Sequence, residues 1–435
     1  MTAKNSDGAR QEYKFGKSQA YFALLICCLL FLTNFMCRQL FSVVLEPMKI
    51  DLGLTDTQAG WIQSFFLLCV AFFSFPIGRM VDRWSRSKAI GLMALIWSIF
   101  SFVTGLGRNF IQVVLPRTLV AMGEAGFSAG STALLSSNFP TRMRSKVLGI
   151  FNMMMPLGTI ISVVLGGYLS VNFGGWRTPF YIFAIPGLIL GVIAFFLRDY
   201  PTVNNNQGGK GNSLIKDAQK MLKIPTLKWM YLGWGMHNFM YYAVSAWMPA
   251  LFIRTLNIAE DKAGLITGVV IAASVISAPL GGFIADSWHK GNHQSRKLLV
   301  PLAGNIISIV AVCLSIAALN LKLFVPAFIL LGIWGIGSLL GVGPVNAVSQ
   351  DVVTPAYRGT SWGLAMFFMY LIGAWSPVLI GMISDILGGG ASGLGIAIAV
   401  ASIISVPAAY FCWLASRHYI SDMEKAKTDE QLNAT

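Results

Sequence analysis

The sequence GRMVDRWSRSK, residues 78–88, is a short charged stretch between two long apolar runs. A related stretch, GFIADSWHK at residues 282–290, follows in the second part of the chain. Each contains a glycine, three further residues and an aspartate where an apolar run ends, namely Gly78 with Asp82 and Gly282 with Asp286. A repeat spaced by half the chain predicts two similar halves.

The composition indicates a membrane protein. The 435 residues are 55% hydrophobic and 11% charged, whereas about 25% of the residues of a soluble domain are charged. An apolar stretch of about 20 residues crosses a bilayer as a helix. We therefore predict an all-α polytopic membrane protein with twelve transmembrane helices, at residues 20–45, 58–78, 88–107, 110–138, 145–170, 178–197, 227–253, 262–285, 297–319, 322–350, 359–386 and 392–416.

The basic residues, which give a net charge of +14, are concentrated in alternate loops. This is the bias of cytoplasmic loops, and it predicts that both termini are cytoplasmic. Attraction to anionic lipid headgroups is then enough to explain the excess positive charge. We therefore predict no nucleic-acid partner. We expect an integral protein of a bacterial inner membrane. Its basic loop residues include Lys14, Lys17, Arg83, Arg86, Lys88, Arg142, Arg144, Lys146, Lys216, Lys220, Lys223, Arg296, Lys297 and Arg417, against Lys49, Arg108, Arg177 and Arg254 on the opposite side.

Polar intervals divide the chain. The longest internal one, rich in Asn, Gly and Lys, separates the two sets of six spans and is typical of a linker. Part of it, residues 213–222, predicts an amphipathic helix. In the tenth span, the glycines of residues 332–343 beside Pro344 predict a bend. The predicted organisation is a cytoplasmic tail at 1–19, a six-helix bundle at 20–197, a cytoplasmic linker at 198–226, a second six-helix bundle at 227–416 and a cytoplasmic tail at 417–435.

Two six-helix halves, a central linker and a repeated Gly-x-x-x-Asp loop together resemble the major facilitator superfamily. The family's loop motif reads Gly-x-x-x-Asp-Arg-x-Gly-Arg-Lys, and Gly78, Asp82, Arg83 and Arg86 match it. The second copy retains only its glycine and Asp286. The resemblance implies twelve helices in two pseudo-symmetric bundles and a monomeric transporter.

The sequence is more closely similar to the Spinster-like branch, and more loosely to the anion:cation symporters. The fourth span carries RTLVAMGEA at residues 117–125, which resembles the Arg-x-x-x-Gly-x-Gly-Glu-Ala signature of these branches. The stretch GWRTPF at residues 175–180 resembles their entry to the sixth helix. The first-helix motif Asp-Arg is replaced by Cys37-Arg38, so the family's first carboxylate is absent.

Ionisable residues inside a span are unfavourable in lipid unless they face a cavity or a partner. Three lie well inside the first half: Arg38, Arg117 and Glu124. The resemblance places the first and fourth helices around a central cavity. Burial and a neighbouring arginine act in opposite directions on the proton affinity of a carboxyl. We predict that Glu124, with Arg117, is the proton-coupling site; the alternative is a structural ion pair between them.

Arg38 is the candidate for binding an anion, because guanidinium offers a bidentate fork to a carboxylate or phosphate. The alternative is that Arg38 extends toward the membrane surface near the end of its span. Its neighbour Cys37 supplies no acid to neutralise it. This favours an anionic substrate, and it also leaves open proton coupling through Glu124 alone or no proton coupling.

The second half has polar and aromatic cavity candidates rather than charges. Packing or interfacial anchoring is the alternative for the aromatic members. A charged first half opposite an aromatic second half suits an anionic amphiphile or a small aromatic acid. With Arg38 and Asn34, the predicted substrate-binding residues are Tyr242, Trp247, Asn346 and Trp375; further candidates are His237, Asn238, Tyr241, Gln350, Trp362 and Tyr370.

The charged loop carries a separate prediction. The resemblance implies a conformational latch in which Asp82 contacts a helix N-terminus or a basic group of the other half, an arrangement that is electrostatically favourable. The alternative is that the loop only determines topology. The predicted latch comprises Gly78, Asp82, Arg83, Arg86 and Asp286.

The sequence contains no phosphate-binding loop, no metal-ligand spacing and no nucleophile beside a base, so we predict neither an enzyme nor a cofactor or metal site. We predict a secondary active transporter that moves a small organic anion or anionic amphiphile by alternating access with protons. The alternatives are an uncoupled facilitator, a lysolipid exporter of the Spinster type, and a transporter-like receptor or sensor.

Overall fold

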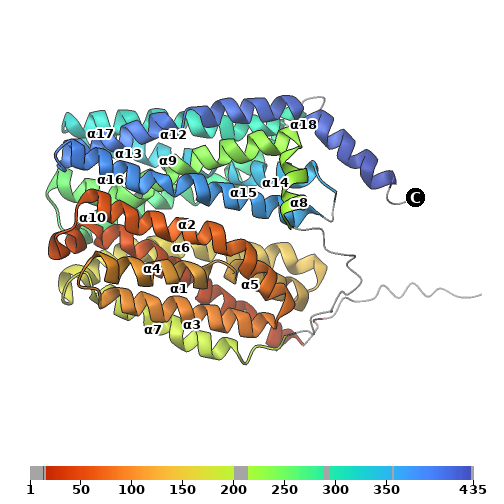
Figure 1. The fold of residues 1–435 in the computed structure, drawn as a ribbon, viewed down its shortest axis with the longest axis horizontal. Helices are drawn as coiled ribbons and strands as arrows, with labels where there is room; N and C mark the ends of the chain where they lie inside the picture. The colour runs from red at the N-terminus through yellow and green to blue at the C-terminus, as the bar shows by residue number, and fades with distance from the viewer. Residues whose placement is uncertain (1–12, 14–15, 200–213, 289–293, 355–356, 433–435) are drawn as a thin grey trace, which may run out of the picture.

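The computed structural model describes residues 13, 16–199, 214–288, 294–354 and 357–432. Side chains within these ranges are described except at 75, 78–83, 141, 145, 214–215, 294–295 and 429–432. The described chain forms long helices that lie side by side (Figure 1). The prediction of an all-α membrane fold is confirmed. Most of the predicted linker, residues 200–213, lies outside the described residues.

The helices form two groups. The first half, red to yellow in Figure 1, lies on one side of the molecule, and the second half, green to blue, on the other. The first half contains α1 (Lys17–Leu52), α2 (Asp56–Arg83), α3 (Arg86–Gly105), α4 (Phe110–Glu124), α5 (Phe127–Asn138), α6 (Thr141–Asn172) and α7 (Thr178–Ala194). The second contains α9 (Pro225–Leu256), α10 (Glu260–Ser274), α11 (Ser277–Trp288), η1 (Gln294–Leu298), α12 (Leu299–Asn320), α13 (Phe324–Leu339), α14 (Val342–Asp351), α15 (Arg358–Gly373), α16 (Trp375–Ile386), α17 (Ala391–Ile404) and α18 (Pro407–Leu432).

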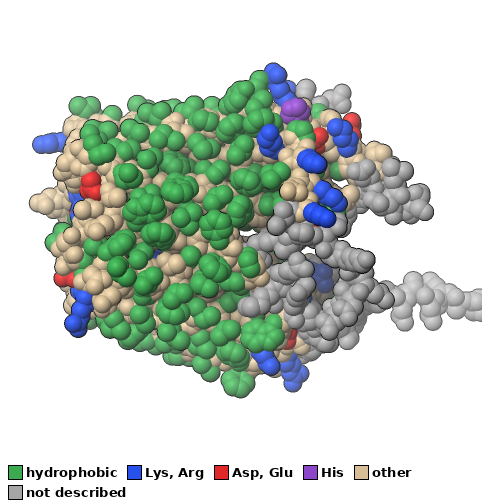
Figure 2. Space-filling model, viewed as in Figure 1, with side chains coloured by type: hydrophobic (Ala, Val, Ile, Leu, Met, Phe, Trp, Pro, Cys, Tyr) green, Lys and Arg blue, Asp and Glu red, His purple; other side chains and the backbone are tan. Residues whose placement is uncertain are grey.

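The short helix α8 (Leu214–Leu222) packs on α9 and α15 and matches the predicted amphipathic segment. It lies at the end of the molecule where α1 begins and α18 ends, which is on the right in Figure 1. We call this the terminal end and the opposite one the distal end. Figure 2 shows a broad hydrophobic belt on the face between them, with charged side chains gathered at both ends. This distribution is that of a protein embedded in a bilayer.

Within the described residues, nine helices are long and apolar enough to cross a membrane, and α7 is a shorter apolar helix. Two further elements, α9 and the α4–α5 pair, run along the molecule beside them. Both coincide with predicted spans and carry buried polar groups, among them Arg117, Glu124, His237 and Asn238. Buried polar side chains lower hydropathy, and they mark the helices that line functional regions of membrane proteins.

Several spans are broken in the middle, and a proline follows four of the breaks, one of them Pro407, the first residue of α18. Pro279, Pro344 and Pro377 are each the third residue of the helix that follows a break, in α11, α14 and α16. Proline has no backbone N–H and its ring clashes with the preceding turn. The break between α13 and α14 coincides with the bend predicted beside Pro344. The break between α4 and α5 has no proline and falls directly after Glu124.

The two halves pack through α2 with α15 and α16, α6 with α10, and α1 with α9. Glycine allows the closest approaches. A side chain at Gly264 on α10 would collide with the backbone of Val163 on α6, and one at Gly381 on α16 with the backbone of Asp56 on α2. By contrast, the packing partners of α5 belong to the first half and those of α11 and α14 to the second. The tight contact between halves is therefore at the distal end.

Candidate functional site

The centre of the molecule holds an ion pair between the first and fourth spans. Arg38 on α1 lies with its Nη1 atom 3.9 Å from Oε2 of Glu124, the last residue of α4. Both side chains are largely buried. Neither oxygen of Glu124 accepts a hydrogen bond from the described residues. The structure thus brings together the two residues predicted to bind an anion and to exchange a proton.

The second half reaches this pair through Tyr370 on α15. Its hydroxyl accepts a hydrogen bond of 3.3 Å from Nη1 of Arg38. The Arg38 guanidinium also lies 5.2–5.6 Å from the ring centroids of Phe35, Phe66 and Tyr370, distances at which aromatic rings stabilise a cation. Arg38 is therefore inside the molecule, and it does not extend to the membrane surface.

Arg117 has a different environment. Its guanidinium donates to the backbone oxygens of Cys37, at 2.9 Å, and of Arg38. It lies over the rings of Phe41 and Phe66 and is fully buried. Glu124 is thus paired with Arg38 rather than with Arg117. Arg117 fixes the backbone of α1 at the turn that carries the central arginine.

The residues around Arg38 on α1 are enclosed. The Cys37 thiol is fully buried and lies 3.6 Å from the carbonyl oxygen of Phe183 on α7. Asn34, one turn before Arg38, is buried, and its Nδ2 atom has no partner among the described residues. The side chain at the position of the predicted motif's missing acid therefore faces a carbonyl oxygen.

The predicted second-half residues separate into two groups. Tyr242 stacks on Tyr370 with ring centroids 6.0 Å apart, so it belongs to the central site. Trp247 is fully buried and donates to the backbone oxygen of Pro377 at 3.1 Å. Asn346 accepts a hydrogen bond from Gln350 on the same helix, and Trp375 is 50% exposed. The structure does not bring these last three to the central site.

The predicted latch lies largely outside the described side chains, which exclude Gly78, Asp82 and Arg83. Arg86 is the first residue of α3, and Asp286 is exposed on α11. The start of α3 has a partner that the sequence does not indicate. Asp199 accepts hydrogen bonds from the Ser85 hydroxyl at 2.8 Å and the Ser87 amide at 3.3 Å, an anionic cap of the helix.

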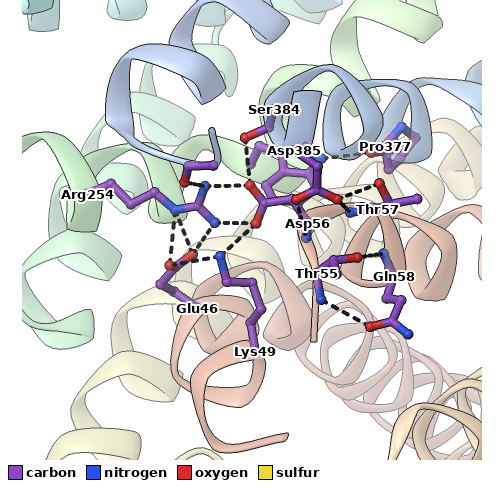
Figure 3. Close-up of polar contacts among 12 residues, drawn as sticks. Glu46, Lys49, Thr55, Asp56, Thr57, Gln58, Arg254, Pro377, Ser384 and Asp385 are labelled. Atoms are coloured by element: carbon purple, nitrogen blue, oxygen red, sulfur yellow. Dashed lines mark hydrogen bonds and ion pairs between the residues drawn. The ribbon is translucent and has the colours of Figure 1, made fainter. Parts of the chain in front are cut away.

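A second charged group, the distal cluster, joins the halves at the distal end (Figure 3). Arg254 on α9 lies 2.7 Å from Glu46 on α1 and 2.6 Å from Asp56 at the start of α2. Lys49 Nζ is 2.7 Å from the same aspartate. Asp56 is 1% exposed, and it also accepts a hydrogen bond of 2.6 Å from Ser384 on α16. We define the distal cluster as Glu46, Lys49, Asp56, Arg254, Ser384 and Asp385.

The last member, Asp385 on α16, caps a helix of the other half. Its Oδ1 accepts from the Asp56 amide at 3.0 Å, and its Oδ2 accepts from the Thr57 amide at 2.8 Å and the Thr57 hydroxyl at 2.6 Å (Figure 3). The first amides of a helix have no intrahelical partner and attract negative charge. The sequence does not predict this cluster, because its charged residues lie near the ends of spans, where charges are common. The one signal is that three of them, Glu46, Asp56 and Asp385, are acids close to a predicted span end.

The chain is similar to known transport proteins in both sequence and structure. A family model described as Major Facilitator Superfamily matches residues 27–377. An efflux pump of this type from Mycolicibacterium smegmatis is 27% identical over 94% of this chain and 96% of its own. A hexuronate transporter of Bacillus subtilis is 26% identical over 81% and 85%. The crystal structure of a bacterial homologue of the human lysosomal transporter Spinster, inward-facing and unoccupied, superposes with a TM-score of 0.81 at 24% identity, over 94% of this chain and 99% of that one. The predicted family is confirmed.

Proposed function

The chain belongs to the Major Facilitator Superfamily and is a secondary transporter rather than an enzyme, and we propose that it moves a small organic anion by alternating access, coupled to protons. The observation that carries this proposal is the contact of Arg38 with both Glu124 and Tyr370. This contact joins a buried cation, a buried acid and the other half of the molecule at one point. Substrate binding and protonation can therefore both change the contacts between the halves at this point.

The charge of the site favours an anion. Two buried arginines, Arg38 and Arg117, face one carboxyl in the described centre. The site therefore has an excess positive charge even when Glu124 is ionised. Arg117 is bound to backbone oxygens, while the hydrogen bonds of Arg38 in the described chain go only to Tyr370. A guanidinium has five N–H donors, so Arg38 has donors left for a carboxylate of the substrate.

Coupling follows from competition for Arg38. The ionised Glu124 is the counter-ion of Arg38, at 3.9 Å. When Glu124 takes up a proton, Arg38 loses this counter-ion and a substrate carboxylate replaces it. Because uncompensated charge inside a membrane protein is unfavourable, the proton and the anion bind best together. Release of either one on the other side of the membrane then promotes release of the second.

We propose the following placement in the membrane. The terminal end faces the cytoplasm of a bacterial cell, as the basic loops predict. Residues 20–197 and 227–416 are the two moving bundles, 198–226 is their linker, and 1–19 and 417–435 are cytoplasmic tails. The monomer is the working unit. Because the two halves are in tight contact at the distal end, the central site then opens toward the cytoplasm.

A second substrate class has one supporting observation. Tyr241, Tyr242, Tyr370 and Trp334 form consecutive ring contacts of 5.5–6.1 Å beside Arg38. Such a surface suits the apolar part of a lysolipid-type amphiphile. An uncoupled facilitator is the alternative to proton coupling, because Cys37 replaces the usual acid. Hexuronates, other organic acids and lysolipids are therefore the substrates to compare.

The test uses purified protein in liposomes, with wild type, Glu124→Gln and the exposed Glu424→Gln as a matched control. We expect one anion class to accumulate under an imposed proton gradient in the wild type and the control. Glu124→Gln abolishes the accumulation but retains exchange of labelled for unlabelled substrate. Accumulation that persists unchanged in Glu124→Gln would contradict proton coupling at this residue. If only lysolipids accumulate, the substrate is an anionic amphiphile rather than a small organic acid.

A further inference from the structure

We propose that Arg254 and Asp385 are positioning residues for transport: they hold the two halves together at the distal end, and their contacts must break each time the site opens there. This proposal depends on the chain being an alternating-access transporter, and it is independent of the substrate and of proton coupling. Arg254 and Asp385 belong to the second half. The carboxylates that pair with Arg254, and the amides and hydroxyl that donate to Asp385, belong to the first.

The Arg254 contacts are numerous and shielded from water. Its guanidinium contacts Glu46 through Nε and Nη2 and Asp56 through Nη1 and Nη2, at 2.6–3.0 Å. Its side chain is 8% exposed. Paired and hydrogen-bonded charges at this depth bind more strongly than surface pairs. The pairs therefore stabilise the distal-closed state specifically, since separation of the halves removes all of them.

The cluster is also built to open. When the halves separate, Lys49 stays with Asp56 and Glu46, at 2.7 and 3.6 Å, because all three belong to the first half. Arg254 keeps its 3.0 Å hydrogen bond to the backbone oxygen of Gly389. Among the described residues, Lys49 then remains as the one cation beside these two acids.

Asp385 supports the same conclusion from the helix it caps. The start of α2 already has a local cap: the Thr55 amide donates to the Gln58 side chain at 3.0 Å, and the Gln58 amide donates to the Thr55 hydroxyl at 3.2 Å (Figure 3). This reciprocal pair is a capping box. The helix therefore does not need Asp385 in order to form. The additional cap from the second half therefore stabilises the arrangement in which the two halves are in contact at the distal end.

The test measures distances between the halves at both ends. Spin labels are placed on cysteines introduced at the exposed Ile50 and Ile386 for the distal end, and at the exposed Lys146 and Ser287 for the terminal end. The background replaces the native cysteines. The variants are Asp385→Asn and Arg254→Gln, measured in liposomes by pulsed electron paramagnetic resonance. We expect each variant to raise the ratio of distal-open to distal-closed molecules by about tenfold or more, as loss of a charged hydrogen bond predicts.

The matched control is Asp51→Asn. Asp51 forms an ion pair of 2.7 Å with Arg177 and accepts a hydrogen bond from Trp176, at the same end but within the first half. We expect this control to leave both distance distributions unchanged, and we expect the terminal distances of the two test variants to shorten as their distal distances lengthen. Unchanged distances in both test variants, with only a lower melting temperature, would overturn the proposal. An equal shift in Asp51→Asn would overturn it as well.

Discussion

The Arg38 guanidinium, on the first helix, and the Tyr370 hydroxyl, on α15, lie 3.3 Å apart across the boundary between the two halves. Tyr370 is in the last turn of α15, and the break before α16 follows at Ala374, whose amide bonds to the Tyr370 carbonyl oxygen. The other end of α16 carries Asp385. One broken span therefore connects the central arginine with the distal cluster.

The first prediction concerns this hydroxyl. Tyr370→Phe keeps the ring over Arg38 and removes the oxygen that orients the guanidinium. We expect substrate KM to rise about two- to tenfold, equivalent to the roughly 0.5–1.5 kcal/mol of an ordinary hydrogen bond, with kcat less affected. Uptake kinetics in liposomes measure both constants. The control Tyr410→Phe, at an exposed tyrosine, should match wild type; equal KM values in Tyr370→Phe and wild type would exclude this role.

Arg117 is predicted to affect stability more than transport. Its guanidinium holds two successive carbonyl oxygens of α1, and the single ammonium of lysine does not reproduce this planar fork. We expect Arg117→Lys to lose roughly 2 kcal/mol. Thermal unfolding of purified protein measures the loss, with the exposed Arg108→Lys as control. An Arg117→Lys protein of normal stability that no longer couples substrate to protons would instead place Arg117 in the coupling step.

Cys37 gives the third prediction, since the Asp-Arg motif that this stretch resembles has an acid at this position. The buried thiol faces the Phe183 carbonyl oxygen at 3.6 Å, so a carboxylate there would meet an acceptor without water. Burying an ion without such solvation is costly. We expect Cys37→Asp to unfold at a lower temperature than Cys37→Ser, whose hydroxyl can donate to the same oxygen. If the two variants unfold at the same temperature, the site accommodates a carboxylate.

The charged residues of the centre could be predicted from the sequence because lipid makes charge rare, but Glu124 was assigned to Arg117 rather than to its actual partner Arg38. Arg38 and Glu124 stand out in apolar runs, and motif resemblance places their helices around one cavity. The spans were predictable for the same reason: a bilayer requires long apolar helices. The break after Glu124 was not, because no proline marks it, Gly123 was interpreted only as part of the fourth-helix signature, and Gly126, just after that signature, was not interpreted as a break.

The distal cluster shows what sequence patterns omit. Arg254 and Glu46 are 208 residues apart, and each lies near the end of a span, where charges are common. Lys49 and Arg254 could be read only as the few basic residues of the outer loops. Their pairing depends on how two separately folded bundles dock, and no local periodicity encodes that. For the same reason Trp375 was predicted to bind substrate and Tyr370, five positions before it, was only a further candidate, although Tyr370 is the one that contacts Arg38.

The last prediction separates those two aromatic residues. Trp375 is half exposed and meets Trp61 edge to face at 6.2 Å, whereas Tyr242 stacks on Tyr370 beside Arg38. We expect Trp375→Ala to leave KM within about twofold of wild type and Tyr242→Ala to raise it more than about tenfold, because only the second removes a ring packed on the site. Trp247→Phe serves as a third case.

Trp247→Phe keeps the buried ring but loses the N–H hydrogen bond to the Pro377 backbone oxygen. We therefore expect a loss of stability of about 1 kcal/mol with KM unchanged. Uptake kinetics and thermal unfolding of the three purified variants provide the comparison. A large rise in KM for Trp375→Ala would mean that the substrate reaches the outer surface of α16. The binding region would then extend from Arg38 past the helix break at Ala374.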